Sequence, residues 1–319
     1  SMINTDGREH ADRRAINRAK FTPKAIHHYE AIVRGVAIDL IERAKTLDQC
    51  DLVRDLALPL PMHVIGRMME LPEVDHERLL HWSDLIATGL ANMPLEFESE
   101  VLHAANEFES YISEWFARRE ANPGDDLLTA IVKGKIAGRP LGRKDKIHEA
   151  LLLLVGGDET TRHVLTGGVV ALLERPEQLE ALRRDSSAIS LAVEEMLRWA
   201  TPVKTLARTV KEKTTLSGQH LNVGDRVILL YESGNRDDTV FLKPNEFDIS
   251  RQPNRHLSFG GYGPHHCLGA HLARLEIRVM LEEILTRLPN LRRRTTGPLP
   301  KRFGTFVLGF ESVPIEFKL

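Results

Sequence analysis

The sequence has few cysteines, no long apolar run and no excess of charge of either sign. Its two cysteines, Cys50 and Cys267, lie far apart in a chain of 319 residues, which excludes the disulfide framework of a small exported protein. The most apolar stretch, 150–155, is far shorter than the roughly 20 residues that a membrane-spanning helix needs. The N-terminus also lacks the pattern of a signal peptide. We therefore expect a cytoplasmic protein that is not held in a membrane.

The charge balance argues against a nucleic-acid partner. Lys and Arg number 43 and Asp and Glu number 45, which gives a formal net charge of -2 and no global basic field. The sequence also lacks a G-x-G-x-x-G pattern after a strand, so a bound nicotinamide or flavin is not expected. Apolar residues make up 42% of the chain, which is enough for a sizeable core.

Hydrophobic periodicity predicts one mainly α domain over 1–319 with small β-sheets. Helical spacing dominates about 10–200 and 267–288, and β-like runs are confined to about 203–231 and 303–317. The expected helices are 23–45, 52–69, 73–89, 94–121, 125–136, 143–173, 176–184, 187–199 and 267–288, and the expected strands include 205–209, 214–216 and 226–231.

A glycine-rich loop precedes a lone cysteine within 258–274. Gly260, Gly261 and Gly263 come before Cys267, which is expected to open an amphipathic helix. Free N–H groups and the helix dipole at such a position favour the thiolate. A thiolate is a metal ligand or a nucleophile. The alternative is a buried cysteine that acts as a small hydrophobic side chain.

The centre of the expected helix 143–173 contains a polar interruption. Gly156 and Gly157 each cost roughly 1 kcal/mol relative to alanine in a helix interior. Small residues let another body lie flat against the helix, and the Thr160 hydroxyl can compete for a backbone carbonyl and open a groove. Glu159 and Thr160 could then pass protons. The alternative is a break at the two glycines, after which Asp158 and Glu159 cap a second helix.

A third motif, Glu195 and Arg198, is uninformative alone, but the three motifs in this order resemble those of the cytochrome P450 superfamily of haem-thiolate monooxygenases. The family pattern F-G-x-G-x-H-x-C-x-G is matched, with one extra residue before Gly263, by Phe259, Gly260, Gly263, His265, Cys267 and Gly269. The pattern A/G-G-x-D/E-T-T falls on Gly156, Gly157, Glu159, Thr160 and Thr161, and F-x-x-P-x-x-F-x-x-x-R on Phe241, Pro244, Phe247 and Arg251.

The resemblance implies haem b, iron protoporphyrin IX, with Cys267 as the proximal iron ligand. It implies that Thr160 and Glu159 relay protons to dioxygen on the opposite side. Glu195, Arg198 and Arg251 look like a structural network. The remaining expected haem contacts are the propionate-binding positions His265, Arg208, His10 and Arg14, together with Phe259, Gly260, Gly269, Gly156 and Gly157.

The implied reaction inserts one oxygen atom from O2 into a hydrophobic substrate. The residues at 157–163, 198–203 and 259–267 look most like those of actinobacterial enzymes that oxidise steroids and methyl-branched lipids, so we expect a steroid, terpenoid or fatty chain. The pocket is expected to be lined by residues before Gly156, by 203–206 and by 306–308. Electrons are expected from a separate ferredoxin and its reductase.

The chain begins close to His10, whereas members of the family carry a further segment before this position, so we expect an N-terminally shortened fold. Either an upstream segment or a second subunit would cover the haem edge, which makes a homo-oligomer an open option. One alternative function is a haem-thiolate protein that binds haem but does not oxygenate. A zinc site at His265, His266 and Cys267 is disfavoured because the ligands are adjacent and no second cysteine is near.

Overall fold

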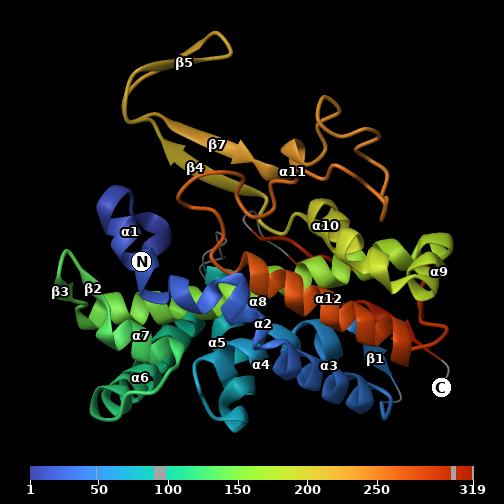
Figure 1. Ribbon diagram of the computed structural model, residues 1–319, viewed down its shortest axis with the longest axis horizontal. Helices are drawn as coiled ribbons and strands as arrows, with labels where there is room; N and C mark the ends of the chain where they lie inside the picture. Colours follow the sequence, from blue (N-terminus) through green and yellow to red (C-terminus); the bar gives the residue numbers. More distant parts are fainter. Residues whose placement is uncertain (48, 90–97, 303–306, 318–319) are drawn as a thin grey trace.

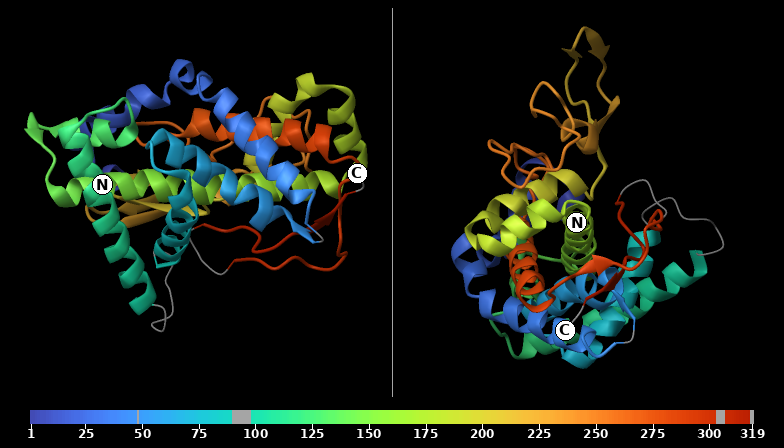
Figure 2. Two further views of the ribbon diagram at one scale, coloured as in Figure 1. Left: turned by 90° about the horizontal axis from the view of Figure 1, so that it is seen from below. Right: turned by 90° about the vertical axis from the view of Figure 1, so that its right-hand side faces the viewer.

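The computed structural model describes residues 1–47, 49–89, 98–302 and 307–317. One long helix, α8 (Arg143–Leu173), runs lengthwise through the molecule and is surrounded by other helices (Figures 1 and 2). Its bounds agree with the prediction. Nearly all residues of 161–172 are buried, as expected for a stretch that is apolar on every side. Helix α8 packs against α4 (Pro59–Met68), α5 (His76–Gly89), α10 (Ile189–Ala200) and α12 (Ala270–Arg287).

The other helices follow the predicted order with shifted ends. The segment predicted as one helix over 23–45 is divided at His28 and Tyr29. The Thr22 hydroxyl accepts the Ala25 N–H at 3.3 Å and so caps the first piece. The remaining α-helices of the described residues are α1 (Gly7–Arg18), α2 (Pro23–His27), α3 (Glu30–Ala44), α6 (Glu98–Ala121), α7 (Leu127–Lys133), α9 (Pro176–Arg184) and α11 (Tyr231–Gly234).

The predicted helix 52–69 consists of two kinds of helix. Residues 52–57 form a π-helical stretch, in which the Leu58 N–H donates to the Val53 carbonyl at 2.9 Å. Helix α4 then begins at Pro59, whose fixed φ and missing N–H suit a first helical position. The periodicity of apolar residues does not distinguish these two bonding patterns.

Two further predicted ends differ from the structure, and a third cannot be compared with it. The helix predicted for 125–136 ends at Lys133, and 135–136 pair with 139–140 as a hairpin. The last helix begins at Ala270 rather than at Cys267. Pro94, the predicted start of another helix, lies outside the described residues.

The strands are short, and the two longest, β4 (Thr205–Thr209) and β7 (Arg226–Leu230), lie in an arm that stands off the helical body (Figures 1 and 2). In this arm β4 pairs antiparallel with β7, with Thr205 opposite Leu230 and Thr209 opposite Arg226. Near the C-terminus, β9 pairs with both β1 and β8; of the predicted β-rich tail 303–317, residues 303–306 lie outside the described part. The strands are β1 (Cys50–Asp51), β2 (Lys135–Ile136), β3 (Arg139–Pro140), β4 (Thr205–Thr209), β5 (Thr214–Leu216), β6 (Gln219–Leu221), β7 (Arg226–Leu230), β8 (Arg292–Arg293) and β9 (Pro314–Glu316).

None of the described helices is both long enough and apolar enough to cross a bilayer. The apolar core instead lies around α8 and includes side chains from nearly every helix.

Candidate active site

The Cys267 loop is shaped by glycines and by backbone hydrogen bonds. Gly260, Gly261 and Gly263 have φ of +89°, +66° and +110°, values that glycine adopts readily and other residues rarely. The Cys267 N–H donates to the Phe259 carbonyl at 2.9 Å. The Phe259 ring itself contacts Arg274, whose guanidinium carbon lies 4.6 Å from the ring centre. The loop therefore holds Cys267 in a fixed place just before α12.

Burial and the neighbouring polar groups act on the pKa of the Cys267 thiol in opposite directions. Although Cys267 keeps contact with solvent, protein atoms around the sulfur displace water, and this desolvation raises the pKa of the thiol. The Gly269 N–H and the charges of Arg14 and Arg274 act in the opposite direction but do not outweigh it. Helix α12 starts at Ala270, three residues after Cys267, so the sulfur lies just before the helix and not at its first residue.

His10, Arg14 and His265 lie together near the loop that carries Cys267. The rings of His10 and His265 stack with centres 4.1 Å apart, and the His265 Nε2 lies 3.1 Å from the Asp6 Oδ1. His10 is buried, and its Nε2 has no hydrogen-bond partner among the described residues. Arg14 is close enough to Cys267 to interact with its charge. Helix α1 thus brings His10 and Arg14 to the loop that carries the cysteine.

Arg208 is the exception among the predicted propionate contacts. It is an exposed residue of β4, and its Nη1 donates to the Ala207 carbonyl at 2.9 Å. No contact in the described structure connects Arg208 with His10, His265 or Cys267.

The two central glycines lie within an unbroken helix. Helix α8 continues through Gly156 and Gly157, so the alternative of a break with a capped second helix is wrong. A Cβ at Gly156 would meet no atom within 4 Å, although the nearby Leu154 is fully buried. The Thr160 hydroxyl donates to the Gly156 carbonyl at 3.1 Å, as expected for a hydroxyl that competes for the backbone. One face of α8 is therefore open at Gly156.

Glu159 lies in a charged cluster within the core. Its Oε1 contacts the Nη2 of Arg162, and its Oε2 lies 3.7 Å from the Nε2 of His163. Burial would raise the pKa of Glu159, but the neighbouring His163 and the charges of Arg162 and Arg302 outweigh burial and lower it. Burial lowers the pKa of His163, and the neighbouring Glu159 carboxylate opposes this shift.

Several of these neighbours were not identified from the sequence. Arg162 and His163 belong to the same run as Glu159, and their helical spacing could have indicated contact. Arg302 lies far along the chain, and no sequence signal joins it to Glu159. Asp158 was interpreted only as a cap, yet it is fully buried and accepts a hydrogen bond from Ser83 at 3.1 Å.

Glu195, Arg198 and Arg251 form the predicted network. The two side chains Glu195 and Arg198 are completely buried and paired through two hydrogen bonds of 2.8 and 2.7 Å. Arg251 Nε donates to Glu195 Oε2 at 3.1 Å. The network joins α10 to the irregular chain that leads to Cys267.

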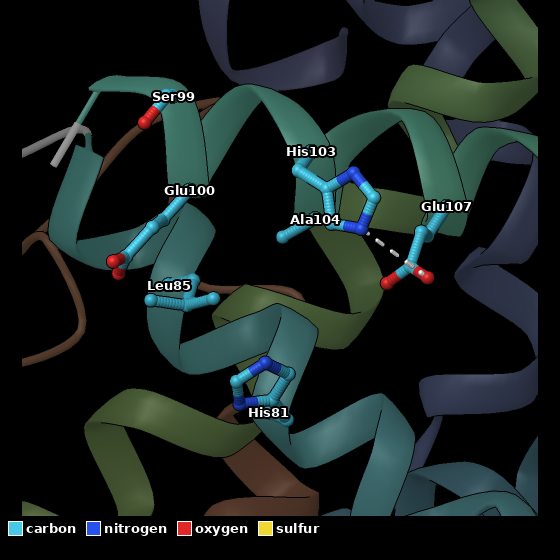
Figure 3. A pocket seen from close by; sticks show the side chains of 7 residues that line it. All are labelled: His81, Leu85, Ser99, Glu100, His103, Ala104 and Glu107. Carbon is cyan, nitrogen blue, oxygen red and sulfur yellow. Dashed lines mark ion pairs between the residues drawn. The ribbon is translucent and has the colours of Figure 1, made fainter.

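A pocket of about 320 Å³ lies between α5 and α6, and none of the predicted site residues lines it (Figure 3). In this pocket the His103 Nε2 lies 3.6 Å from the Glu107 Oε1. Among the described residues, no group of three or more His, Cys, Asp and Glu side chains is arranged to hold a metal ion.

Comparisons with known proteins agree with the geometry. A family model described as Cytochrome P450 matches residues 76–319. The chain is 41% identical over 318 residues to a steroid C26-monooxygenase of Mycobacterium tuberculosis (strain CDC 1551 / Oshkosh), covering 99% of this chain and 85% of that protein. It is 38% identical over 322 residues to a methyl-branched lipid omega-hydroxylase of Mycobacterium bovis (strain ATCC BAA-935 / AF2122/97), covering 99% of this chain and 74% of that protein.

Solved structures show the same similarity. P450BioI, in complex with an acyl carrier protein ligated to hexadec-9Z-enoic acid, has a TM-score of 0.93 at 30% identity and covers 100% of this chain and 81% of its own. CYP109E1 from Bacillus megaterium, in complex with corticosterone, has a TM-score of 0.90 at 33% identity and covers 100% of this chain and 86% of its own. The chain therefore belongs to the cytochrome P450 family and is a P450 monooxygenase, and the family implies a haem cofactor.

Proposed function

We propose that this monooxygenase holds haem b through Cys267 and inserts one oxygen atom from O2 into a steroid, terpenoid or methyl-branched lipid. The observation that carries this proposal is the 41% identity, over 99% of the chain, to a steroid C26-monooxygenase. The similarity to a methyl-branched lipid omega-hydroxylase supports the same class of large apolar substrates.

The residues present suit a haem. A large flat ligand needs an open helix face, and Gly156 provides one at which even a Cβ would meet no atom within 4 Å. An anionic propionate needs hydrogen-bond donors, and the buried Nε2 of His10 has no partner among the described residues. Iron needs a thiolate, and Cys267 is the cysteine held in the exposed glycine-rich loop.

Each of these residues has a separate task in the proposal. When haem is bound through a thiolate, it supplies the activation of O2. The Gly269 N–H donates to the Cys267 sulfur and moderates its basicity, as is typical of groups around a metal ligand. His10, Arg14 and His265 would bind the propionates. A similar task for Arg208 remains a prediction.

Proton transfer in the proposal depends on Thr160 and Glu159. The Thr160 hydroxyl stands beside the open face at Gly156 and can hold a proton at its Oγ1. Glu159 supplies a carboxylate one residue away that can exchange a proton with it after the side chain moves. A pure haem-binding function gives no reason for this acid and hydroxyl in a helix interior.

The lining of the substrate pocket supports an apolar substrate. Residues 151–153 and Val155 are half-buried and apolar along the stretch of α8 that precedes Gly156. The predicted lining segments also lie together, since Val203 bridges to Val307 and the Leu308 N–H donates to the Pro202 carbonyl at 3.0 Å. Phe306, the other predicted residue of that turn, lies outside the described residues.

The electrons are proposed to come from a ferredoxin and its reductase, because the sequence has no nicotinamide or flavin fingerprint. The test supplies the haem-loaded chain with a surrogate ferredoxin system, a steroid and ¹⁸O-labelled O2. We expect a hydroxylated steroid carrying one ¹⁸O atom.

Cys267→Ser is the matched variant, because it keeps the size and polarity of the side chain. It should abolish both the product and the shifted absorption band of the reduced carbon monoxide complex. Oxygen uptake that gives only hydrogen peroxide with every steroid and branched lipid would favour the haem-binding alternative. An unchanged band in Cys267→Ser would show that the iron ligand is misassigned.

A further inference from the structure

Glu159 and three other charged side chains form a closed ring of ion pairs. Arg162 Nη2 lies 2.7 Å from Asp84 Oδ1 and also contacts Glu159 Oε1. Arg302 Nη1 lies 2.6 Å from the same Asp84 oxygen and 3.5 Å from the same Glu159 oxygen. Two cations thus alternate with two carboxylates, and the formal charges cancel. We call Asp84, Glu159, Arg162 and Arg302 the ion ring.

The ion ring joins three parts of the chain and extends from the core to the surface. Asp84 belongs to α5, Glu159 and Arg162 to α8, and Arg302 to the segment after β8. The exposed fraction of the side chain is 0% for Arg162 and 6% for Glu159, but 21% for Arg302 and 41% for Asp84. The C-terminal tail also touches α8 here, since a Cβ at Gly309 would lie 1.9 Å from the His163 Nδ1.

In the ion ring, Glu159 does not reach its expected partner Thr160. Successive side chains of an α-helix point about 100° apart, because 3.6 residues complete a turn. The Thr160 hydroxyl donates to the Gly156 carbonyl, while the Glu159 Oε1 faces two guanidinium groups. Within the described residues, no hydrogen bond joins the Thr160 hydroxyl to the Glu159 carboxylate.

We infer that Arg302 is a positioning residue for Glu159: its guanidinium closes the ion ring beside Asp84, and Glu159 reaches the Thr160 hydroxyl only when the ring opens. This inference rests on the proposed function, in which Glu159 exchanges protons. Arg302 is the cation that can be removed with the least disturbance, since Arg162 is wholly buried within α8.

The charges around Glu159 give this inference a pH dependence. The groups that face Glu159 are Asp158, Arg162 and His163 from α8 and Arg302 from the segment after β8, and Asp84 from α5 lies behind the two arginines. An opposite charge within a few ångström lowers a carboxyl pKa by about 1 to 3 units. Loss of Arg302 should therefore raise the pKa of Glu159, and loss of Asp84 should lower it.

The first test measures the titration of Glu159 without any turnover. Infrared difference spectra of the full chain against Glu159→Gln identify the Glu159 carboxyl band. We expect Arg302→Gln to move the midpoint of this band upward by about one pH unit, and Asp84→Asn to move it downward. Lys301→Gln, an exposed neighbour, is the matched control and should leave the midpoint in place. The two opposite shifts are required by the ring geometry.

The second test measures coupling, the product formed per O2 consumed, across pH in the haem-loaded enzyme. In Arg302→Gln, the part of the coupling profile that follows the titration of Glu159 should move to higher pH together with the infrared midpoint. Arg302→Lys, which keeps the positive charge, should return it to its position in the parent enzyme. If Arg302→Gln fails to fold, the expected downward shift of the Glu159 midpoint in Asp84→Asn tests the inference alone. Midpoints that stay in place in both variants would overturn the inference.

The proposed function fails in a different way. If Glu159→Gln leaves coupling unchanged, Glu159 exchanges no proton in turnover, whatever the infrared midpoints show. If Glu159→Gln reduces coupling but neither ring variant moves the titration, the relay stands and the positioning role of Arg302 is wrong.

Discussion

Thr160 shows how one hydroxyl can alter a helix without breaking it. Its Oγ1 donates to the Gly156 carbonyl four residues earlier, the same acceptor that the helical N–H of residue 160 uses. A carbonyl that accepts two donors holds each less tightly, so this turn of α8 is easier to deform. Gly156, with open space beside it, lies at the place where that deformation matters for a ligand.

Thr160→Ala is expected to leave haem binding intact but to reduce the product formed per electron pair by tenfold or more, since positioned proton transfer is worth roughly 10² to 10⁴ in rate. The lost electrons should appear as hydrogen peroxide. Thr160→Ser, which keeps the hydroxyl, is the matched control and should retain coupling. The measurement is product and peroxide per O2 consumed; equal coupling in Thr160→Ala would remove Thr160 from the proton path.

At this scale the sequence predicted the chemistry of residues better than their orientation. The Gly-Gly pair and the lone Cys267 identify themselves through the energetic cost of glycine in a helix and through the loop that glycine shapes. The direction of Glu159 was not predictable in this way. Its carboxylate contacts Arg162 of the same run and also faces Arg302, which lies more than a hundred residues further along the chain and enters the site only through tertiary packing.

Asp158 is the most informative residue for the packing of α8 as an element. It is fully buried, and its Oδ2 accepts a hydrogen bond from the Ser83 hydroxyl of α5. Its Oδ1 has no hydrogen-bond partner among the described residues. Burial raises its pKa to about 7, helped by Glu159 and Asp84 and opposed by Arg162 and Ser83. Glu276 of α12 is buried as well, and burial and the nearby Asp158 raise its pKa well above the ordinary value.

The folded chain therefore binds the Asp158 proton more tightly than the unfolded chain does. The stability from this group is fully present below the unfolded pKa of about 4 and is lost as pH rises to about 7, with a slope of up to about 1.4 kcal/mol per pH unit. Asp158→Asn should reduce this slope and be more stable than the parent at pH 8. Urea unfolding between pH 4.5 and 8 measures it, with the exposed Asp238→Asn as control. Identical slopes in Asp158→Asn and the parent would contradict the assignment.

The ends of elements were less predictable than their centres. The range 143–173 was predicted correctly, because an all-round apolar pattern over 31 residues leaves few alternatives. The break at His28 and Tyr29 and the π-helical stretch 52–57 lie inside uninterrupted apolar patterns. Hydrophobic spacing reports which face is buried and not which carbonyl each N–H meets, so it cannot detect either feature.

Across the whole molecule, a long irregular segment carries the cysteine and depends on side chains for its hydrogen bonds. Residues 235–269 contain no regular helix or strand, so their carbonyls need other donors. Arg198 donates to the carbonyls of Asn235, Pro244 and Glu246. Arg251 donates to those of Leu242, Lys243 and Glu246. The motif residues were predictable from the sequence, but these carbonyl partners were not, because irregular backbone has no periodic signal.

Glu195 is the counter-charge that holds both arginines in place. It accepts hydrogen bonds from Arg198 and Arg251, from the Asn254 amide and from the Asp248 N–H. Glu195→Gln leaves two buried guanidinium groups without a carboxylate, and breaking a buried pair in this way costs about 3 to 5 kcal/mol. The loss should appear in the free energy of unfolding and as faster hydrogen exchange within 235–269, because both arginines are then free to leave their carbonyls.

The pair of Glu180, whose side chain is 55% exposed, and the half-buried Arg183, 3.8 Å apart, supplies the control for this substitution. Glu180→Gln should change stability by less than about 1 kcal/mol, since exposed ion pairs contribute little. If Glu195→Gln lost stability but left exchange in 235–269 unchanged, the carboxylate would act only within α10. Faster exchange in that segment, with α8 still protected, would show that the order of the cysteine loop depends on one buried carboxylate outside it.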